Sequence, residues 1–238
     1  ADVRPAVEMS ALPPFFTDYQ ALVAQHLQRI VPDRGSLVER AMAYTALAPS
    51  KQVRAVLVML CAELCRGQAS RAVAAAAAIE LVHAASLILD DLPSMDDAPL
   101  RRGRPSSHLT YGEAVTILAA FGLLNQAFSH IAKSYEPPLA MRLTSLMSGA
   151  VGLDGLVGGQ AEDVLATERA LSFETLERIH RRKMGVFFSA AAAAGVLSAG
   201  GSSADLNALT NYAKNLGLAF QIVDDLLDVT GTTAETVK

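Results

Sequence analysis

The chain has 238 residues, of which 51% are hydrophobic and only 18% are charged, and its formal net charge at pH 7 is −4. A chain of this length can bury a substantial core, and so apolar a composition excludes an intrinsically disordered protein. The negative net charge argues against non-specific nucleic-acid binding, which depends on a cationic face.

Apolar residues recur at helical spacing along most of the chain, and strand-like alternation is scarce. In chain order, we expect helices over about 15–30, from Ser36 to before Pro49, over about 52–66 and 69–91, from Thr110 to about Ser134, from Pro137 through the glycine-rich stretch 149–159, from Ser172 to Gly200, and over about 204–230. Ser36 with Glu39, and Thr110 with Glu113, have the spacing of a capping box. No linker divides the chain, so we predict one all-α domain over residues 1–238, a large helical bundle around a central cavity.

The cysteines and the apolar stretches indicate the cellular compartment in which we expect the protein. Cys61 and Cys65 do not make a disulfide framework and have no further ligands at metal spacing, so we expect two core residues in a reducing cytoplasm. The N-terminus has no basic region followed by an apolar run, so we expect no signal peptide. The uncharged stretch 184–201 is rich in Ala, Gly and Ser, which favours a buried bundle helix over an integral membrane span.

Four aspartates follow the apolar segment that ends near residue 91, namely Asp90, Asp91, Asp96 and Asp97. His83 and Asp90 share one face of that helix, ~10.5 Å apart along its axis. Carboxylates gathered at the mouth of an apolar cavity are costly unless cations compensate them, and oxygen-only ligands suit Mg²⁺. Arg101 and Arg102 follow directly, and guanidinium groups suit bidentate contacts with phosphate.

The last expected helix carries a polar stripe on an otherwise apolar segment. Its members, spaced by four, three and four residues, are Gly217, Gln221, Asp224 and Asp228. A single aspartate cluster is equally typical of a solvated helix end, and the arginines alone would suit a basic patch for nucleic acid. Two clusters on two apolar helices instead predict a site for a diphosphate and divalent cations.

With these motifs in place, the sequence resembles the trans-isoprenyl diphosphate synthases, or polyprenyl synthetases, and most of all the geranylgeranyl diphosphate synthases. The first aspartate cluster with its trailing LRRGRP resembles the first aspartate-rich motif of the family, and FQIVDDLLD (220–228) resembles the second. Four further segments match in order, namely PSKQVRAV (49–56), ELVHAASLILDD (80–91), GGQAEDV (158–164) and RRKMG (181–185).

The resemblance implies an isoprenoid-synthase fold and a role for each matching residue. The implied metal ligands are Asp90, Asp96 and Asp224, supported by Asp91 and Asp228, which would hold three Mg²⁺ when substrate is bound. The implied grip on the allylic diphosphate comes from Arg101, Lys183 and Lys238. Isopentenyl diphosphate would bind without metal to Lys51, Arg54, His83 and Arg102. The reacting centre would be lined by Gln160, Gln221 and the backbone of Lys183.

The implied reaction is head-to-tail prenyl transfer. The allylic carbon–oxygen bond ionises, the isopentenyl double bond attacks the cation, and a proton is lost, with the released diphosphate as the candidate base. Ala85 and Ser86 are small, which leaves room for a long tail and predicts a C20 product, geranylgeranyl diphosphate. Val82 and a residue of the following helix such as Phe121 are candidates for the floor of the pocket. Farnesyl (C15) and longer products stay open, and Ala85 could instead be a helix-packing residue.

Other protein classes fit the motifs less well. Terpene cyclases share the fold and the first motif, but an Asn/Ser/Glu motif and an aromatic cavity are typical of them, and this chain is only 5% aromatic. Non-catalytic partner subunits tend to lose the motif aspartates, and a purely structural helical protein does not need them. The resemblance also implies a homodimer and further C-terminal helices after the position of Lys238. The sequence departs from the family pattern at Met184, where the family has threonine. It also has Pro49-Ser50 in place of glycines before Lys51, and this substitution puts the mobility of that loop in question.

Overall fold

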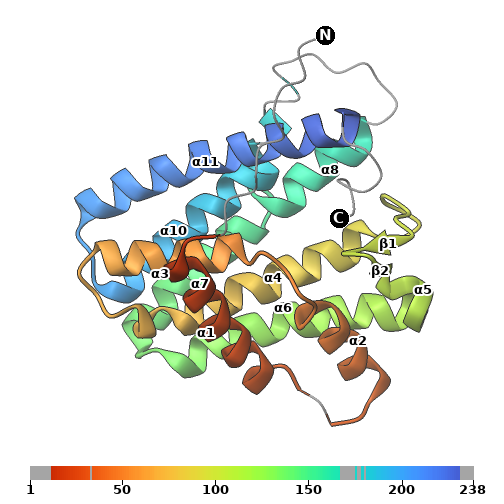
Figure 1. Cartoon of the computed structure of the whole chain (residues 1–238), viewed down its shortest axis with the longest axis horizontal. Helices are drawn as coiled ribbons and strands as arrows, with labels where there is room; N and C mark the ends of the chain where they lie inside the picture. Colours follow the sequence, from red (N-terminus) through yellow and green to blue (C-terminus); the bar gives the residue numbers. More distant parts are fainter. Residues whose placement is uncertain (1–11, 33, 167–174, 176–177, 180, 231–238) are drawn as a thin grey trace.

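The computed structural model describes residues 12–32, 34–166, 175, 178–179 and 181–230, without the side chains of residues 166, 183, 224–225 and 227–230. Its elements are α1 (Pro14–Ile30), α2 (Leu37–Ala46), α3 (Val53–Leu64), η1 (Ala69–Arg71), α4 (Val73–Asp90), β1 (Leu100–Arg101), β2 (Arg104–Pro105), α5 (Ser107–Tyr111), α6 (Glu113–Ser134), α7 (Pro137–Val151), α8 (Leu156–Ala166), η2 (Arg181–Gly185), α10 (Val186–Ala199) and α11 (Ser203–Thr230) (Figure 1). Helices dominate the described part of the chain, which confirms the predicted all-α class.

Helix α4 forms the centre of the bundle, where it packs against α6, α3, α1 and α10. Its first turns contain five consecutive buried alanines, residues 74–78, whose small side chains let the neighbouring helices approach closely. A similar close approach joins α3 to α10. A Cβ atom at Gly195 would lie 2.2 Å from the carbonyl oxygen of Val58, so only glycine fits this crossing.

One of the two predicted capping boxes is present. At the start of α2, the Glu39 N–H donates to Ser36 Oγ (3.2 Å) and the Ser36 N–H donates to Glu39 Oε2 (3.1 Å). The second prediction is wrong, because Thr110 lies inside the short helix α5. Helix α6 begins instead after Gly112, which has a φ of +80° and makes no side-chain cap. The glycine separates two helices that the spacing alone had joined.

The glycine-rich stretch also breaks the chain, since α7 ends at Val151 and α8 begins at Leu156, where one continuous helix had been predicted. The helix start predicted at Ser172 lies outside the described residues. At the other predicted break, Gly200 adopts the left-handed conformation with a φ of +74° and ends α10 as expected.

A two-stranded hairpin that the sequence did not predict follows the first aspartate cluster. Arg101 and Arg104 face each other across the antiparallel pair, and the turn residues Arg102 and Gly103 have φ values of +54° and +71°. Positive φ at both turn residues is the geometry of a two-residue type I′ hairpin. Arginine is uncommon in this conformation, so the sequence carries little signal for the turn.

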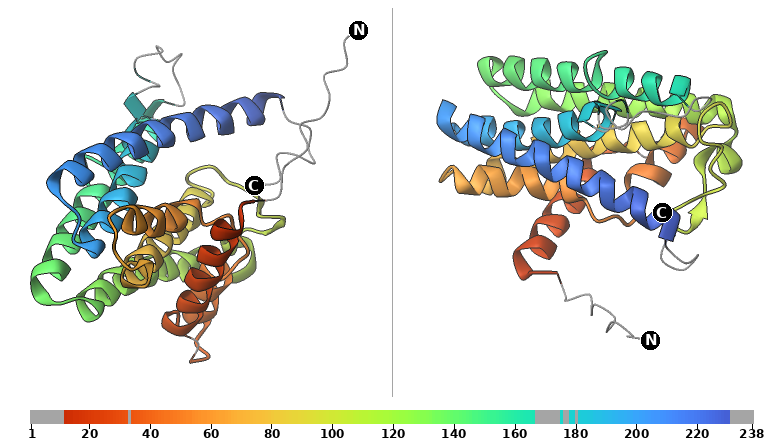
Figure 2. Two further views of the ribbon diagram at one scale, coloured as in Figure 1. Left: turned by 60° about the vertical axis from the view of Figure 1, so that its left-hand side comes forward. Right: turned by 90° about the horizontal axis from the view of Figure 1, so that it is seen from above.

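Both aspartate-bearing helices end at the same end of the molecule. The C-terminal ends of α4 and α11 and the β1–β2 hairpin lie together at that end in Figure 1 and in the view from above in Figure 2. This arrangement brings the two motifs toward one region, as the resemblance implied.

Within the part of the chain that the structure describes, two helices, α4 and α6, are long and apolar enough to cross a membrane by length and composition. The core helix of a soluble protein meets the same criterion, and 67% of the α4 window is buried inside the bundle. The uncharged stretch predicted as a buried bundle helix contains α10, most of whose residues are buried, as expected.

Candidate active site

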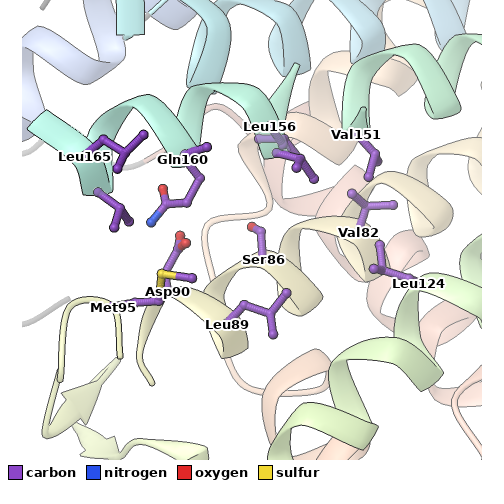
Figure 3. A pocket seen from close by; sticks show the side chains of 13 residues that line it. Val82, Ser86, Leu89, Asp90, Met95, Leu124, Val151, Leu156, Gln160 and Leu165 are labelled. Carbon is purple, nitrogen blue, oxygen red and sulfur yellow. The ribbon is translucent and has the colours of Figure 1, made fainter. Parts of the chain in front are cut away.

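An apolar cavity of about 470 Å³ lies between α4, α6, α7 and α8. It is elongated, with Asp90, Met95, Gln160 and Leu165 at one end and Val82, Leu124 and Val151 at the other (Figure 3). Ser86, Leu89 and Leu156 line the middle. The cavity therefore has a mouth with polar groups and a hydrocarbon interior.

Asp90 and Gln160 meet at the mouth of the cavity. Asp90 is the last residue of α4 and is half-buried, and its carboxylate points toward Gln160 of α8 (Figure 3). Gln160 Oε1 is buried and makes no hydrogen bond within the described part of the chain. A buried amide oxygen without a protein partner is suited to a ligand that supplies positive charge or a donor.

The loop after α4 returns Asp96 to the side of Asp90. The Asp96 N–H donates to the carbonyl oxygen of Asp90 (2.9 Å), and the Asp97 N–H donates to the carbonyl oxygen of Leu92 (3.1 Å). Asp96 is exposed, so its carboxylate is accessible from solvent beside the cavity mouth. Asp97 has a φ of +47°, a conformation that aspartate and asparagine adopt more readily than most residues.

Asp91 and Arg101 form a buried ion pair. Arg101 Nε donates to both oxygens of Asp91 (3.0 and 3.1 Å), and a second guanidinium nitrogen contacts the same carboxylate. Burial lowers the pKa of Arg101, but the hydrogen bond to Asp91 and the charges of Asp91, Asp90 and Asp96 raise it above its ordinary value. Asp91 thus orients the Arg101 guanidinium, and its part as a supporting metal ligand stays a prediction.

Arg54 and His83 form a second cluster, on the α3 side of α4. An Arg54 N–H contacts His83 Nε2 (3.2 Å) and another donates to Met184 Sδ (3.3 Å). The guanidinium carbon lies 5.6 Å and 4.8 Å from the ring centres of Phe187 and Phe188. A buried guanidinium is therefore held by sulfur, imidazole and aromatic faces.

Burial and the nearby arginines keep His83 uncharged. Burial first, and then the charges of Arg54, Arg102 and Arg101, lower the pKa of His83 well below 6.5, so the ring is neutral at pH 7. A guanidinium can only donate, so Nε2 accepts and the ring proton sits on Nδ1. His83 can therefore donate from Nδ1 to an anionic oxygen.

Two more predicted ligands of the isopentenyl diphosphate flank this cluster. Arg102 is half-buried at the hairpin turn, where its guanidinium contacts the carbonyl oxygen of Ala48 (3.4 Å). Lys51 is exposed just before α3, and Gln20 of α1 donates to its carbonyl oxygen (2.8 Å). Gln52 follows in the left-handed conformation, with a φ of +47°. Gln52 thus takes a conformation that glycine adopts more easily. The hydrogen bond from Gln20 anchors the loop before α3, whose mobility was in question, to α1.

The remaining predicted site residues lie on or beyond the later elements. Gln221 is half-buried on α11. Asp224 and Asp228 belong to the last turns of α11 and Lys183 to η2, but the structure describes only their backbone. Lys238 lies outside the described residues. The roles of these residues stay predictions.

The oxygen donors of the described residues at the cavity mouth fit Mg²⁺. Asp90 and Asp96 offer carboxylate oxygens at an accessible edge, which is the ligand type that Mg²⁺ prefers when it retains water and binds a phosphate. Among the described side chains, no three His, Cys, Asp or Glu residues gather into a complete metal site. The first motif therefore offers two carboxylates of the kind that an oxygen-only site requires.

Of three residues that were predicted to shape the tail pocket, two line the cavity and one does not. Ser86 and Val82 line it, whereas Ala85 is fully buried in the helix packing and is not part of the lining. Phe121 is 65% exposed, so its prediction as a floor residue is wrong, and Leu124 takes that place one turn further along α6. The helical register turns Phe121 outward, and the register could not be judged from composition.

Sequence reasoning missed the wall that α8 supplies. Val157, Gln160, Ala161 and Val164 line the cavity at spacings of three, one and three residues, which is the pattern of one helical face. The same spacing is visible in the sequence around Gln160 and could have marked this face.

The polyprenyl synthetase family model matches residues 36–238. The chain is 39% identical over 215 residues to the chloroplastic geranylgeranyl pyrophosphate synthase of Capsicum annuum, covering 89% of this chain and 58% of that protein. Among solved structures, an FPP/GFPP synthase from Zymomonas mobilis superimposes with a TM-score of 0.85 at 30% identity, covering 94% of this chain and 84% of that one. A geranyltranstransferase from Thermotoga maritima superimposes with a TM-score of 0.82 at 34% identity, covering 91% and 79%.

The chain spans less than two thirds of the length of the Capsicum relative. The family match covers most of the chain, the fold agrees with solved relatives, and the aspartate, arginine and histidine positions meet at one end of the bundle. The chain belongs to the polyprenyl synthetase family.

Proposed function

We propose that the protein catalyses head-to-tail prenyl transfer, joining isopentenyl diphosphate to an allylic diphosphate. The observation that carries this is the cavity itself, an apolar tunnel with Asp90 and Gln160 at its mouth. On the α3 side of α4 lies a separate cluster around Arg54 and His83. One region suits a hydrocarbon tail under a metal-bound diphosphate, and the other suits a diphosphate held without metal.

Members of this family use Mg²⁺, and Asp90 and Asp96 are the described residues that would hold it in this chain. When bound, Mg²⁺ stabilises the negative charge that develops on the leaving diphosphate. We infer three ions, shared with Asp224 and Asp228 of α11. Arg101, oriented by Asp91, adds a fixed positive charge beside the same position.

The residues of the cavity suit the cation that ionisation creates. Gln160 Oε1, buried at the mouth, can direct its negative end at the allylic carbon. The apolar side chains below it exclude the water that would otherwise quench a carbocation. On the other side, the neutral His83 donates from Nδ1 to the isopentenyl diphosphate, next to Arg54 and Arg102.

We infer a C20 product, geranylgeranyl diphosphate, from the shape of the cavity. Ser86 lies one turn below Asp90 and is too small to block a growing tail. Beyond Leu89 and Leu156 in the middle, the far end is closed by the side chains of Val82, Leu124 and Val151 (Figure 3). The tail therefore passes Ser86 and stops at this floor.

The test is to incubate the purified chain with Mg²⁺, labelled isopentenyl diphosphate and one primer at a time, namely dimethylallyl, geranyl or farnesyl diphosphate. We expect one predominant C20 product from all three primers, identified by mass. A ceiling at C15 would overturn the C20 proposal and keep prenyl transfer. If no primer gives an elongated product, the proposed prenyl transfer is overturned and the non-catalytic partner subunit is favoured.

We also infer a homodimer in which α6 faces its counterpart. Leu118 and Phe121, three residues apart on α6, are 56% and 65% exposed, which leaves an apolar stripe on its outer face. Sedimentation should show a dimer for the unsubstituted chain and a shift toward monomer for Phe121→Glu. The cytoplasmic location stays a prediction.

A further inference from the structure

A buried carboxylate that the proposed chemistry does not use lies behind the Arg54–His83 cluster. Glu80 is on α4, three residues before His83 and therefore on the same helical face. It is only 6% exposed. A buried carboxylate is costly unless hydrogen bonds and opposite charges compensate it, so its partners indicate what it does.

The first partner is the start of helix α3. Glu80 Oε1 accepts a hydrogen bond from the backbone N–H of Ala55 (3.2 Å), in the first turn of α3. The residue at the N-cap position, Gln52, makes no capping hydrogen bond with its own side chain. Glu80 thus caps α3 from a neighbouring helix, where a negative charge also suits the positive end of the helix dipole.

Two arginines of the cluster act on Glu80 through their charges. Burial raises the pKa of Glu80, while Arg54, the Ala55 N–H and Arg102 act in the opposite direction. Burial lowers the pKa of Arg102, and Glu80 is the first charge that opposes this. The negative charge of Glu80 therefore acts on two guanidinium groups, that of Arg54, which directly precedes Ala55 in the first turn of α3, and that of Arg102 at the hairpin turn.

We propose that Glu80 is the positioning residue of the metal-free diphosphate site. It ties the first turn of α3 to α4 and holds Arg54 and Arg102 beside His83 before any ligand binds. Its carboxylate acts through these groups and does not touch the diphosphate, which it would repel. This inference rests on the proposed function, since it assigns isopentenyl diphosphate to that cluster.

Loss of Glu80 removes both the tie and the counter-charge. The start of α3 then becomes less ordered and the two arginines separate, so part of the binding energy must be spent on rebuilding the site. The effect falls on isopentenyl diphosphate, because the Asp91–Arg101 pair that orients the allylic side does not include Glu80.

The experiment compares Glu80→Ala, which removes charge and hydrogen bond, with Glu80→Gln, which keeps an oxygen for the Ala55 N–H and removes only the charge. Binding of isopentenyl diphosphate is measured by calorimetry in EDTA, and KM is measured separately for each substrate with Mg²⁺. Glu39→Ala is the matched control, because it removes the capping glutamate of α2, away from the cluster.

We expect Glu80→Ala to weaken the binding of isopentenyl diphosphate in EDTA at least about tenfold and to raise its KM equally, with the allylic KM within about twofold of the parent. Glu80→Gln should move in the same direction by a smaller factor, and Glu39→Ala should change neither value. If Glu80→Ala does not fold, Glu80→Gln decides.

Equal changes in both KM values, unchanged binding, or tighter binding in Glu80→Gln would overturn the proposal. Absence of binding by the parent chain in EDTA would overturn it together with the metal-free site. Product formation is scored separately. If the binding of isopentenyl diphosphate depends on Glu80 but the chain makes no product, the proposed reaction is rejected and this inference is kept.

Discussion

The two sides of the cavity mouth are built in different ways. On the metal-free side, Arg54, His83 and Glu80 are largely enclosed by packed side chains of α3, α4 and α10, and each has a protein partner. On the metal side, Asp90 is half-buried, Asp96 is exposed, and the matching aspartates come from α11, which packs mainly on α10 and η2. The fold preforms the first side, whereas the proposed function assigns the completion of the second to cations, because gathered carboxylates repel one another.

The largest expected effect comes from breaking the metal side alone. Asp90→Ala removes the carboxylate at the cavity mouth, and we expect product formation to fall by about a thousandfold, since stabilisation of the leaving diphosphate is lost. Binding of isopentenyl diphosphate in EDTA should stay within about twofold of the parent. Asp97→Asn is the control, because asparagine also accepts the positive φ at this exposed position, and its activity should be near that of the parent. If Asp90→Ala loses both product formation and the binding of isopentenyl diphosphate in EDTA, the two sides do not act separately.

The Asp91–Arg101 pair lies at the border between the two sides. Asp91→Asn leaves a buried guanidinium without its counter-charge, and we expect the free energy of unfolding to fall by about 3 kcal/mol, measured by denaturant titration. Glu162→Gln breaks the more exposed contacts of Glu162 with Arg178 and Arg182, and it should cost no more than about 1 kcal/mol. Similar losses in both variants would contradict the importance of burial at Asp91.

The length of the product tests the cavity under the metal side. Ser86→Phe places a ring one turn below Asp90, so we expect the main product to shift from C20 to C15 or shorter, with little change in the KM of isopentenyl diphosphate. Leu124→Ala opens the floor, and longer products should appear. Phe121→Ala lies on the exposed face of α6 and serves as the control. An unchanged product distribution in Ser86→Phe would place the path of the tail elsewhere.

The smallest expected effect is a pH dependence that belongs to the metal-free side. The folded pKa of His83 lies well below its unfolded value of 6.5 because of burial and nearby arginines, so the unfolded chain binds more protons in the window between them. Stability is therefore full above pH 6.5 and falls as the pH drops through that window toward the folded pKa.

His83→Gln should flatten part of this loss in thermal melts between pH 7 and pH 5. His26 and His130 contribute in the same direction, because their Nε2 atoms lie 2.9 Å apart and their pKa values are also lowered by burial, that of His130 to about 4. Identical pH profiles for the parent and His83→Gln would show that His83 is not held neutral by the fold.

Much of the fold and part of the site followed from local pattern. The start of α2, the extent of α11 and the end of α10 at Gly200 depend on spacing within one turn or on a single glycine, so the sequence was sufficient there. Local spacing was not sufficient for other features. Thr110 entered a separate short helix, and Arg102 turned a hairpin with an unusual positive φ.

The same division holds inside the site. Periodicity alone placed His83 and Asp90 on one face of α4 and identified the aspartate clusters, because residues three and four apart share a face in any helix. Only the tertiary structure decided that Asp91 faces Arg101, that Leu124 and not Phe121 closes the cavity, and that Glu80 meets the start of α3. These outcomes depend on how separate helices cross and on which buried charges must find partners, and neither is encoded in the spacing of one segment.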